Sequence, residues 1–152
     1  MEWADDVGMS INDIDDRYKE LIKKSRRLID ACDDGKGRGE LGRLLGYFQD
    51  YVVTHFGAEE QHMVCHAYPR YDAHKAEHML FISALSGLRE KLAGEACSMQ
   101  VVFETIRIAA EWIAYHARTT DMAMGAFLRA KRSPSLQDAI TKKECATNEA
   151  AA

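Results

Sequence analysis

Apolar side chains recur every three or four residues along four long stretches of the chain. This spacing is typical of one face of an α-helix, so each stretch predicts an amphipathic helix. Glycines and charges interrupt the pattern at 33–39, Pro69 disfavours helix in the residue before it, and AGEACS at 93–98 makes the third break. The inward positions are Ile11, Ile14, Tyr18, Leu21, Ile22, Leu28, Ile29 and Cys32 in the first stretch, Leu41, Leu44, Leu45, Phe48, Val52, His55, Glu59 and Met63 in the second, His74, His78, Phe81, Leu85, Leu88 and Leu92 in the third, and Val102, Ile106, Ala109, Ile113, His116, Ala117, Met124 and Phe127 in the fourth.

Short connections favour antiparallel neighbours, and the strict alternation typical of strands is absent from the sequence. The predicted fold class is therefore all-α, an antiparallel up-down-up-down four-helix bundle. We expect the bundle to occupy residues 1–130 as one domain. Residues 131–152 lack a sustained apolar face, so we expect a C-terminal tail that is partly disordered or forms a short helix.

Composition and charge narrow the class of partner. Of 152 residues, 47% are apolar and 29% charged, and the net charge of −4 is spread without a Lys/Arg-rich stripe. We therefore expect a globular protein with no nucleic-acid partner. No apolar run reaches the roughly 18–20 residues of a membrane span, and the acidic start lacks the apolar core of a signal peptide. We expect no membrane association and a cytoplasmic location, with the four cysteines as free thiols.

Two pairs of polar residues interrupt the inward apolar stripes. His55 and Glu59 stand one helical turn apart in the second stretch, and His74 and His78 do so in the third. A spacing of four residues places both side chains on one face of a helix. Each pair can therefore present two ligands to one ion or to two neighbouring ions.

A third pair, His116 and Asp121, lies in the fourth stretch with a spacing of five residues. On a regular helix these two side chains diverge by about 140°. They can still flank a central site. Alternatively, a local π-bulge turns Asp121 inward, since such bulges favour functional positions. A regular helix with Asp121 facing solvent would contradict the second hypothesis.

Two carboxylates and four histidines on inward faces require compensation for their burial. A buried charged carboxylate is costly unless it is paired or metal-bound, and no inward lysine or arginine offers a partner. Any one histidine alone is more simply a core imidazole bonded to a carbonyl. The joint set favours a first-row metal, and the lack of thiolates disfavours structural zinc or iron–sulfur clusters. Six donors suit two iron ions bridged by Glu59 and Asp121, whereas His62, His66 and Glu60 are expected at the surface.

The chain resembles the hemerythrins, specifically the single-domain bacterial hemerythrin-like proteins. The combined H-x-x-x-E, H-x-x-x-H and H-x-x-x-x-D pattern is specific, although each part alone is weak. The resemblance implies a non-haem di-iron centre inside the bundle, completed by an oxo or hydroxo bridge. The matching stretches cover about 3–128 and are W at position 3, IDDRYKEL at 14–21, HFGAEEQHM at 55–63, HKAEH at 74–78 and WIAYHARTTD at 112–121.

The resemblance also implies a ligand set and a function. Dioxygen would bind reversibly at the iron with fewer protein ligands, in a dry apolar pocket that discourages irreversible oxidation. The implied ligands are His74, His78 and His116 for one iron, His55 for the other, and Glu59 and Asp121 as bridges.

Tyr18 departs from the family pattern, which has a histidine ligand at this position. Three interpretations stay open. Tyr18 ligates iron as a phenolate, which stabilises ferric iron and favours redox or peroxide chemistry. It lies near the iron unbound and leaves an open position. Or it packs in the core and its hydroxyl makes a hydrogen bond to a bridging oxygen or a carboxylate.

The leading function is a non-haem di-iron protein that binds, stores or senses dioxygen or a related small ligand, with no catalytic residue assigned. One alternative is a di-iron enzyme that reduces peroxide or nitric oxide with Tyr18 as a phenolate ligand. It lacks an obvious inward acid or base outside the ligand set. Another alternative is an iron- or redox-sensing interaction module with an unknown protein partner.

Overall fold

The computed structural model describes residues 11–94 and 98–131, and for residues 11–15 and Tyr18 it describes the backbone only. Within these ranges the chain is helical and contains no strand. The helices form four rods, which correspond to the four helical stretches predicted from the spacing of apolar residues. The elements are α1 (Ile11–Asp33), α2 (Gly37–Tyr51), the π-helix η2 (Val52–Phe56), α3 (Gly57–Cys65), α4 (Tyr71–Gly94), α5 (Met99–Glu111), the π-helix η3 (Trp112–Asp121) and α6 (Met122–Lys131).

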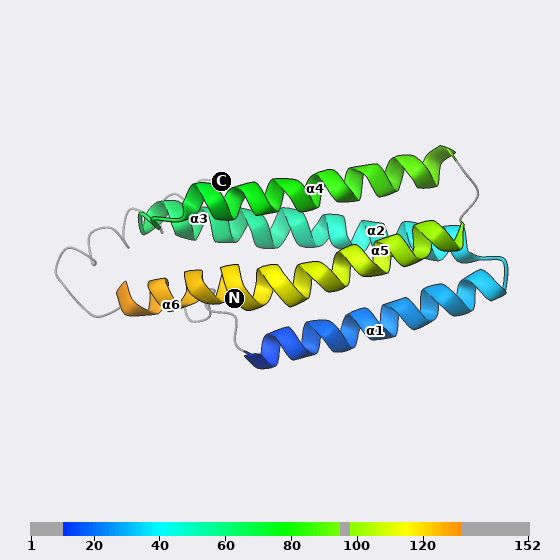
Figure 1. The fold of residues 1–152 in the computed structure, drawn as a ribbon, viewed down its shortest axis with the longest axis horizontal. Helices are drawn as coiled ribbons and strands as arrows, with labels where there is room; N and C mark the ends of the chain where they lie inside the picture. The colour runs from blue at the N-terminus through cyan, green and yellow to red at the C-terminus, as the bar shows by residue number, and fades with distance from the viewer. Residues whose placement is uncertain (1–10, 95–97, 132–152) are drawn as a thin grey trace.

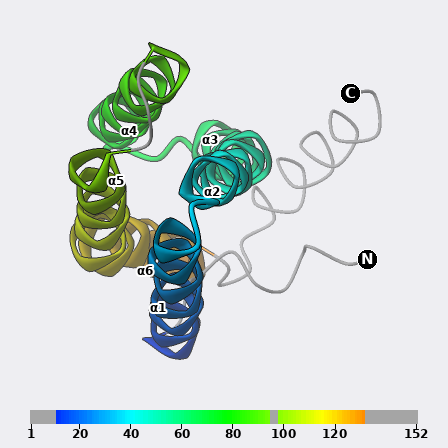
Figure 2. The ribbon, with the colours of Figure 1, turned by 90° about the vertical axis from the view of Figure 1, so that its right-hand side faces the viewer.

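The rods are α1, the continuous segment α2–η2–α3, α4, and the continuous segment α5–η3–α6. Successive rods run in opposite directions along the long axis (Figure 1). Viewed along that axis they stand at four corners (Figure 2), with α1 and α4 each packed against both α2 and α5. The all-α, antiparallel up-down-up-down four-helix bundle is confirmed.

Tight turns connect the first rod to the second and the second rod to the third. The turn after α1 contains Gly35 at φ +74°, and its backbone amides return to the last carbonyls of the helix, as in a glycine-terminated helix. Gly37 opens α2 so close to Cys32 that an added Cβ would lie 2.5 Å from its sulfur. The turn after α3 is completed by the Tyr68 amide, which donates to the Met63 carbonyl at 2.9 Å.

The bundle core consists mainly of the predicted inward residues. The prediction is wrong for Ile22 and Ile29, which are 53% and 36% exposed. The buried line of α1 instead runs through Leu21, Ser25 and Leu28. Because Ile22 and Ile29 each follow a buried leucine by one residue, they are turned about 100° away from the core.

Three expectations from the sequence have different outcomes. Cys32 has a free thiol, but Cys65 is disulfide-bonded, so the expectation of free thiols is wrong for Cys65. No helix in the described part of the chain has the length and apolarity needed to span a bilayer. The predicted tail at 131–152 lies, after Lys131, outside the described residues.

Candidate metal centre

A π-helix brings Asp121 to the inside of the bundle. The segment η3 spans Trp112–Asp121 and therefore contains both members of the pair spaced by five residues. Its wider turn places residues five apart on a common side, where a regular helix would separate them. His116 and Asp121 are each 2% exposed, and the predicted π-bulge is confirmed.

A second π-helix, η2, changes which residue of the second rod faces inward. The prediction from a regular helix put His55 on the inward line. In the structure Phe56 takes this place, at 3% exposure, and His55 is only half-buried. The His55 ring lies against Tyr51, with ring centroids 4.4 Å apart. Burial and the nearby Arg17 guanidinium lower the pKa of His55.

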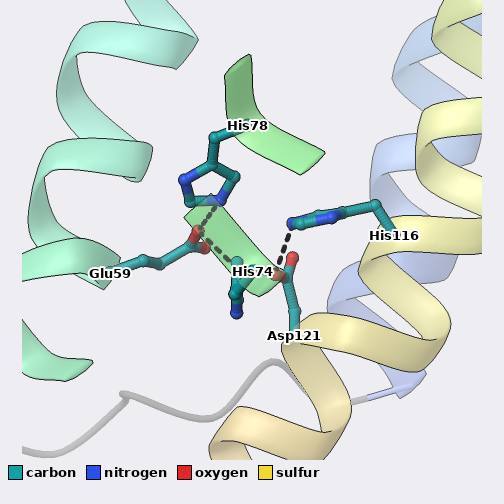
Figure 3. A group of neighbouring side chains, drawn as sticks. All are labelled: Glu59, His74, His78, His116 and Asp121. Carbon is teal, nitrogen blue, oxygen red and sulfur yellow. Dashed lines mark ion pairs between the residues drawn. The ribbon is translucent and has the colours of Figure 1, made fainter. Parts of the chain in front are cut away.

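Five side chains from three rods bring their ligand atoms together (Figure 3). Glu59 comes from α3, His74 and His78 from α4, and His116 and Asp121 from η3. One nitrogen or carboxylate oxygen of each lies within 4.8 Å of every other. The structure thus unites five of the seven residues predicted as metal ligands. His55 is not in this group, and the side chain of Tyr18 lies outside the described part of the chain.

Each carboxylate of the cluster lies between two imidazoles. Asp121 Oδ1 is 2.9 Å from His116 Nε2 and 3.2 Å from His74 Nε2. Glu59 Oε2 is 3.2 Å from His78 Nε2 and 3.9 Å from His74 Nε2. The three histidines therefore all present Nε2 to the same space, where the two carboxylates have positions suited to bridging.

Electrostatic attraction holds part of the cluster together. Burial acts to raise the pKa of Asp121, but the His116 and His74 imidazoles lower it to about 2. Burial acts to lower the pKa of His116, but the Asp121 and Glu77 carboxylates raise it overall. Without a cation, Asp121 is thus a carboxylate whose charge is balanced by a readily protonated His116.

Apart from the ion-pair contacts that they make with one another, the inner faces of these side chains lack hydrogen-bond partners. Within the described residues, the partnerless buried atoms include the Nε2 of all three histidines, Glu59 Oε2 and both Asp121 oxygens. A buried polar group without a partner costs about 1–3 kcal/mol, so several in one place need a shared partner. A cation satisfies them all, and three imidazoles with two carboxylates and no thiolate suit a first-row metal such as iron.

Glu60 supports the cluster from behind, although the sequence placed it at the surface. Its Oε1 accepts a hydrogen bond from His78 Nδ1 at 3.0 Å, and its Oε2 lies 3.1 Å from Lys75 Nζ. These contacts lower its pKa although partial burial acts to raise it. The prediction of a solvent-facing Glu60 is wrong because the residue points toward α4, one side chain away from Glu59.

Glu77 has the same relationship to another histidine of the cluster. Its Oε2 accepts from His116 Nδ1 at 2.6 Å and from the Thr120 hydroxyl at 2.9 Å. The sequence analysis missed Glu77. Only its place between His74 and His78 in HKAEH offered a signal. A carboxylate behind a ligand histidine orients its ring and makes it a stronger donor.

Aromatic rings cover the cluster on the side toward the middle of the bundle. Phe56 stacks on His78, with ring centroids 3.8 Å apart and ring planes inclined by 5°. The ring centroids of Phe81 and Trp112 are 4.4 Å apart. Phe81 and Trp112 also line a pocket of about 40 Å³ with mostly apolar walls. The cluster therefore borders a mostly apolar region.

Tyr51 is a second residue that the sequence analysis did not single out. Its ring is partly buried between His55 and Phe56, and its hydroxyl accepts a hydrogen bond from Arg17. Burial raises the pKa of the Tyr51 hydroxyl, against the lowering effect of Arg17. Tyr51 is therefore a neutral phenol over the whole physiological range.

Comparisons with known proteins show the family relationship of the chain. The family model described as the hemerythrin HHE cation binding domain matches residues 10–128. The chain is 34% identical over 132 residues to a bacteriohemerythrin of Methylococcus capsulatus, covering 86% of this chain and 98% of that protein. It is 30% identical over 137 residues to a bacteriohemerythrin of Pseudomonas aeruginosa, covering 90% and 86%. It is 29% identical over 119 residues to myohemerythrin-1 of Phascolopsis gouldii, covering 78% and 87%.

Proposed function

Because the chain belongs to the hemerythrin family, we propose that it binds dioxygen at a di-iron centre formed around the buried cluster. Hemerythrins are oxygen-binding di-iron proteins. The observation that carries the proposal is the convergence of buried, partnerless donor atoms from three rods. Among the described residues, no lysine or arginine side chain is a hydrogen-bond partner of these atoms.

The proposed ligand set follows the positions of these donors. His74, His78 and His116 would hold one iron, and Glu59 and Asp121 would be the carboxylates shared by the two irons. His55 is the proposed histidine of the second iron. Its support is its place on η2, one turn before Glu59, while its ring lies against Tyr51.

The protein supplies orientation and a dry environment. Glu60 and Glu77 hold the rings of His78 and His116 with Nε2 turned inward. Phe56 and Trp112 cover those rings and exclude water from the bundle side. When bound, an iron pair supplies reversible electron exchange with dioxygen. The surrounding rings favour reversibility, since excluding water and protons suppresses side reactions.

A second candidate function rests on Tyr18. A phenolate oxygen stabilises ferric iron and opposes stable dioxygen carriage. An enzyme that reduces peroxide or nitric oxide is therefore the alternative, and it requires Tyr18 to reach the iron. Steady-state turnover of either substrate, compared between the wild type and Tyr18→His, separates this candidate from a carrier.

Metal analysis and rapid mixing test the leading proposal. Protein purified without added iron is expected to contain two irons per chain. Ferrous protein mixed with air in a stopped-flow instrument is expected to form an oxygenated species that reverts under vacuum. Direct oxidation without such a species contradicts carriage, and a chain that takes up zinc but no iron contradicts the di-iron proposal altogether.

We also propose a cytoplasmic location, on the basis of composition. The disulfide at Cys65 weighs against it, because disulfides persist mainly in oxidising compartments. Fractionation of cells that express the full chain decides between a cytoplasmic and an exported protein. Recovery in the periplasmic or extracellular fraction contradicts the proposal.

A further inference from the structure

We propose that Glu77 is a positioning residue that sets the donor strength of His116 and makes it the most electron-rich histidine of the centre. The inference rests on the proposed metal centre and extends it to a residue outside the ligand set. It assigns different roles to two carboxylates that occupy similar positions, Glu77 behind His116 and Glu60 behind His78.

The contact geometry gives the two ring nitrogens of His116 different roles. Its Nδ1 lies 2.6 Å from Glu77 Oε2. A carboxylate accepts hydrogen bonds and does not donate them, so Nδ1 carries a proton that it donates to Glu77. Nε2 lies 2.9 Å from Asp121 and faces the other donor atoms of the cluster, so it is the nitrogen that a metal would bind in place of a proton. Glu77 thereby leaves Nε2 as the ligand nitrogen.

The position of Glu77 is itself held by a second contact. The Thr120 hydroxyl donates to the same Oε2 atom at 2.9 Å. Thr120 and His116 both belong to η3, whereas Glu77 belongs to α4. The carboxylate therefore joins the two rods at the level of the cluster, and the same π-helix that turns Asp121 inward presents both donors to Glu77.

Comparison with Glu60 indicates why the two carboxylates differ. Glu60 accepts from His78 Nδ1 at the longer distance of 3.0 Å, and its other oxygen lies 3.1 Å from the Lys75 ammonium. Lys75 neutralises part of the negative charge that Glu60 offers to His78. The contacts of Glu77 come from an imidazole and a neutral hydroxyl, so more of its charge is directed at His116.

The chemical consequence is an uneven pair of histidines. A short hydrogen bond to an anion gives an imidazole part of the character of an imidazolate, which strengthens its bond to a metal and favours the higher oxidation state. The iron that binds His116 is thus expected to be the more easily oxidised, and Glu77 to contribute more to this than Glu60.

Three variants separate charge from geometry. Glu77→Gln keeps an acceptor for Nδ1 but removes the charge, Glu77→Ala removes both, and Glu60→Gln is the matched control behind His78. Two readouts are measured. The first is the affinity of the iron-free protein for ferrous ion under anaerobic conditions, together with the reduction potential of the loaded protein. The second is the ¹⁵N shift of the His116 ring in the iron-free protein.

Glu77→Gln is expected to weaken ferrous binding by about 10- to 100-fold and raise the reduction potential, while Nδ1 of His116 keeps its hydrogen bond and nearly its ¹⁵N shift. Glu77→Ala is expected to change the ¹⁵N shift of Nδ1 as well, because the acceptor is lost, and Glu60→Gln to change affinity by a smaller factor. Equal effects of Glu77→Gln and Glu60→Gln, or an unchanged ¹⁵N shift of Nδ1 in Glu77→Ala, would overturn the proposal. A wild type that binds no iron instead contradicts the proposed function, and the ¹⁵N measurement on iron-free protein still tests Glu77.

Discussion

The indole ring of Trp112 stacks on the imidazole of His116, with ring centroids 3.8 Å apart and planes inclined by 16°. The two residues lie four apart in η3, so the π-helix that turns Asp121 inward also sets this stack. The ring of Phe56 covers His78 in the same manner, at 3.8 Å. Two histidines of the cluster are thus held by a carboxylate at Nδ1 and by an aromatic face.

Removing the indole is expected to destabilise the bundle. Trp112→Ala should cost about 3 kcal/mol of unfolding free energy, because it deletes a large ring packed against Phe81 and His116. Urea denaturation of the iron-free protein measures this. Tyr115→Ala is the control, because Tyr115 is 70% exposed and its truncation should change stability by no more than about 0.5 kcal/mol. A similar loss in both variants would contradict the role of the stack.

Histidines inside and outside the cluster are expected to differ in iron binding. His74→Ala should abolish or strongly reduce iron uptake, because the His74 Nε2 faces both carboxylates. His66→Ala is the matched control, since His66 lies at the C-cap of α3 and its Nδ1 contacts the His62 carbonyl instead of the cluster. Iron per chain, determined by elemental analysis after anaerobic loading, is the measurement. Equal loading of both variants would contradict the assignment of the centre.

His55 provides a separate test of the second iron. If His55 holds that iron, His55→Ala should lower the iron content from two per chain toward one, while His74→Ala affects both. Elemental analysis and Mössbauer spectra of ⁵⁷Fe-loaded protein distinguish one site from two. A His55→Ala protein that keeps both irons would show that His55 is not a ligand.

The pattern of apolar residues predicted the bundle and most of the cluster, for a physical reason. The third stretch is a regular helix, so its period of 3.6 residues placed His74 and His78 correctly. The wide spacing of His116 and Asp121 was itself a sign of irregular helix. His55 gave no such sign, since its spacing from Glu59 fits a regular helix, and η2 alters the inward position to Phe56.

The carboxylates behind the histidines were beyond the reach of the sequence. Glu60 and Glu77 each act on a histidine of a different rod, at separations of 18 and 39 residues. Such contacts depend on how α3, α4 and η3 are rotated relative to one another, which the period of one helix does not determine. Glu60 also stands beside Glu59, and neighbours on a helix point about 100° apart, which favoured the incorrect surface assignment.

The charge pair of His116 and Asp121 gives the iron-free protein a defined pH dependence. The pKa of Asp121 is lowered from 3.8 to about 2, so its contribution to stability is present above pH 3.8 and lost as the pH falls through about 2. The pKa of His116 is raised above 6.5, so its contribution is present below pH 6.5 and lost as the pH rises through the raised value.

The contribution of the pair is therefore complete only between about pH 4 and 6.5. Urea denaturation of the iron-free protein at a series of pH values is expected to show this maximum, and Asp121→Asn to flatten it. Iron uptake should instead increase as the pH rises above 6, because a metal competes with the proton of His116. Iron-free stability that rises steadily from pH 6 to 8 would contradict this account of the cluster.

Whether Tyr18 binds iron distinguishes a carrier from a redox enzyme. The visible spectrum of the ferric protein measures this. A phenolate bound to ferric iron absorbs broadly in the visible range through charge transfer from oxygen to metal. If Tyr18 is a ligand, the ferric protein should show this band and Tyr18→Phe should lose it, with Tyr51→Phe as the control because Tyr51 is held as a neutral phenol by burial. Tyr18→His, which replaces the phenol with an imidazole donor, should then slow oxidation of the ferrous protein by air. An identical spectrum in Tyr18→Phe and the wild type would exclude ligation, and the reversible dioxygen-binding function would then be favoured over peroxide or nitric oxide reduction.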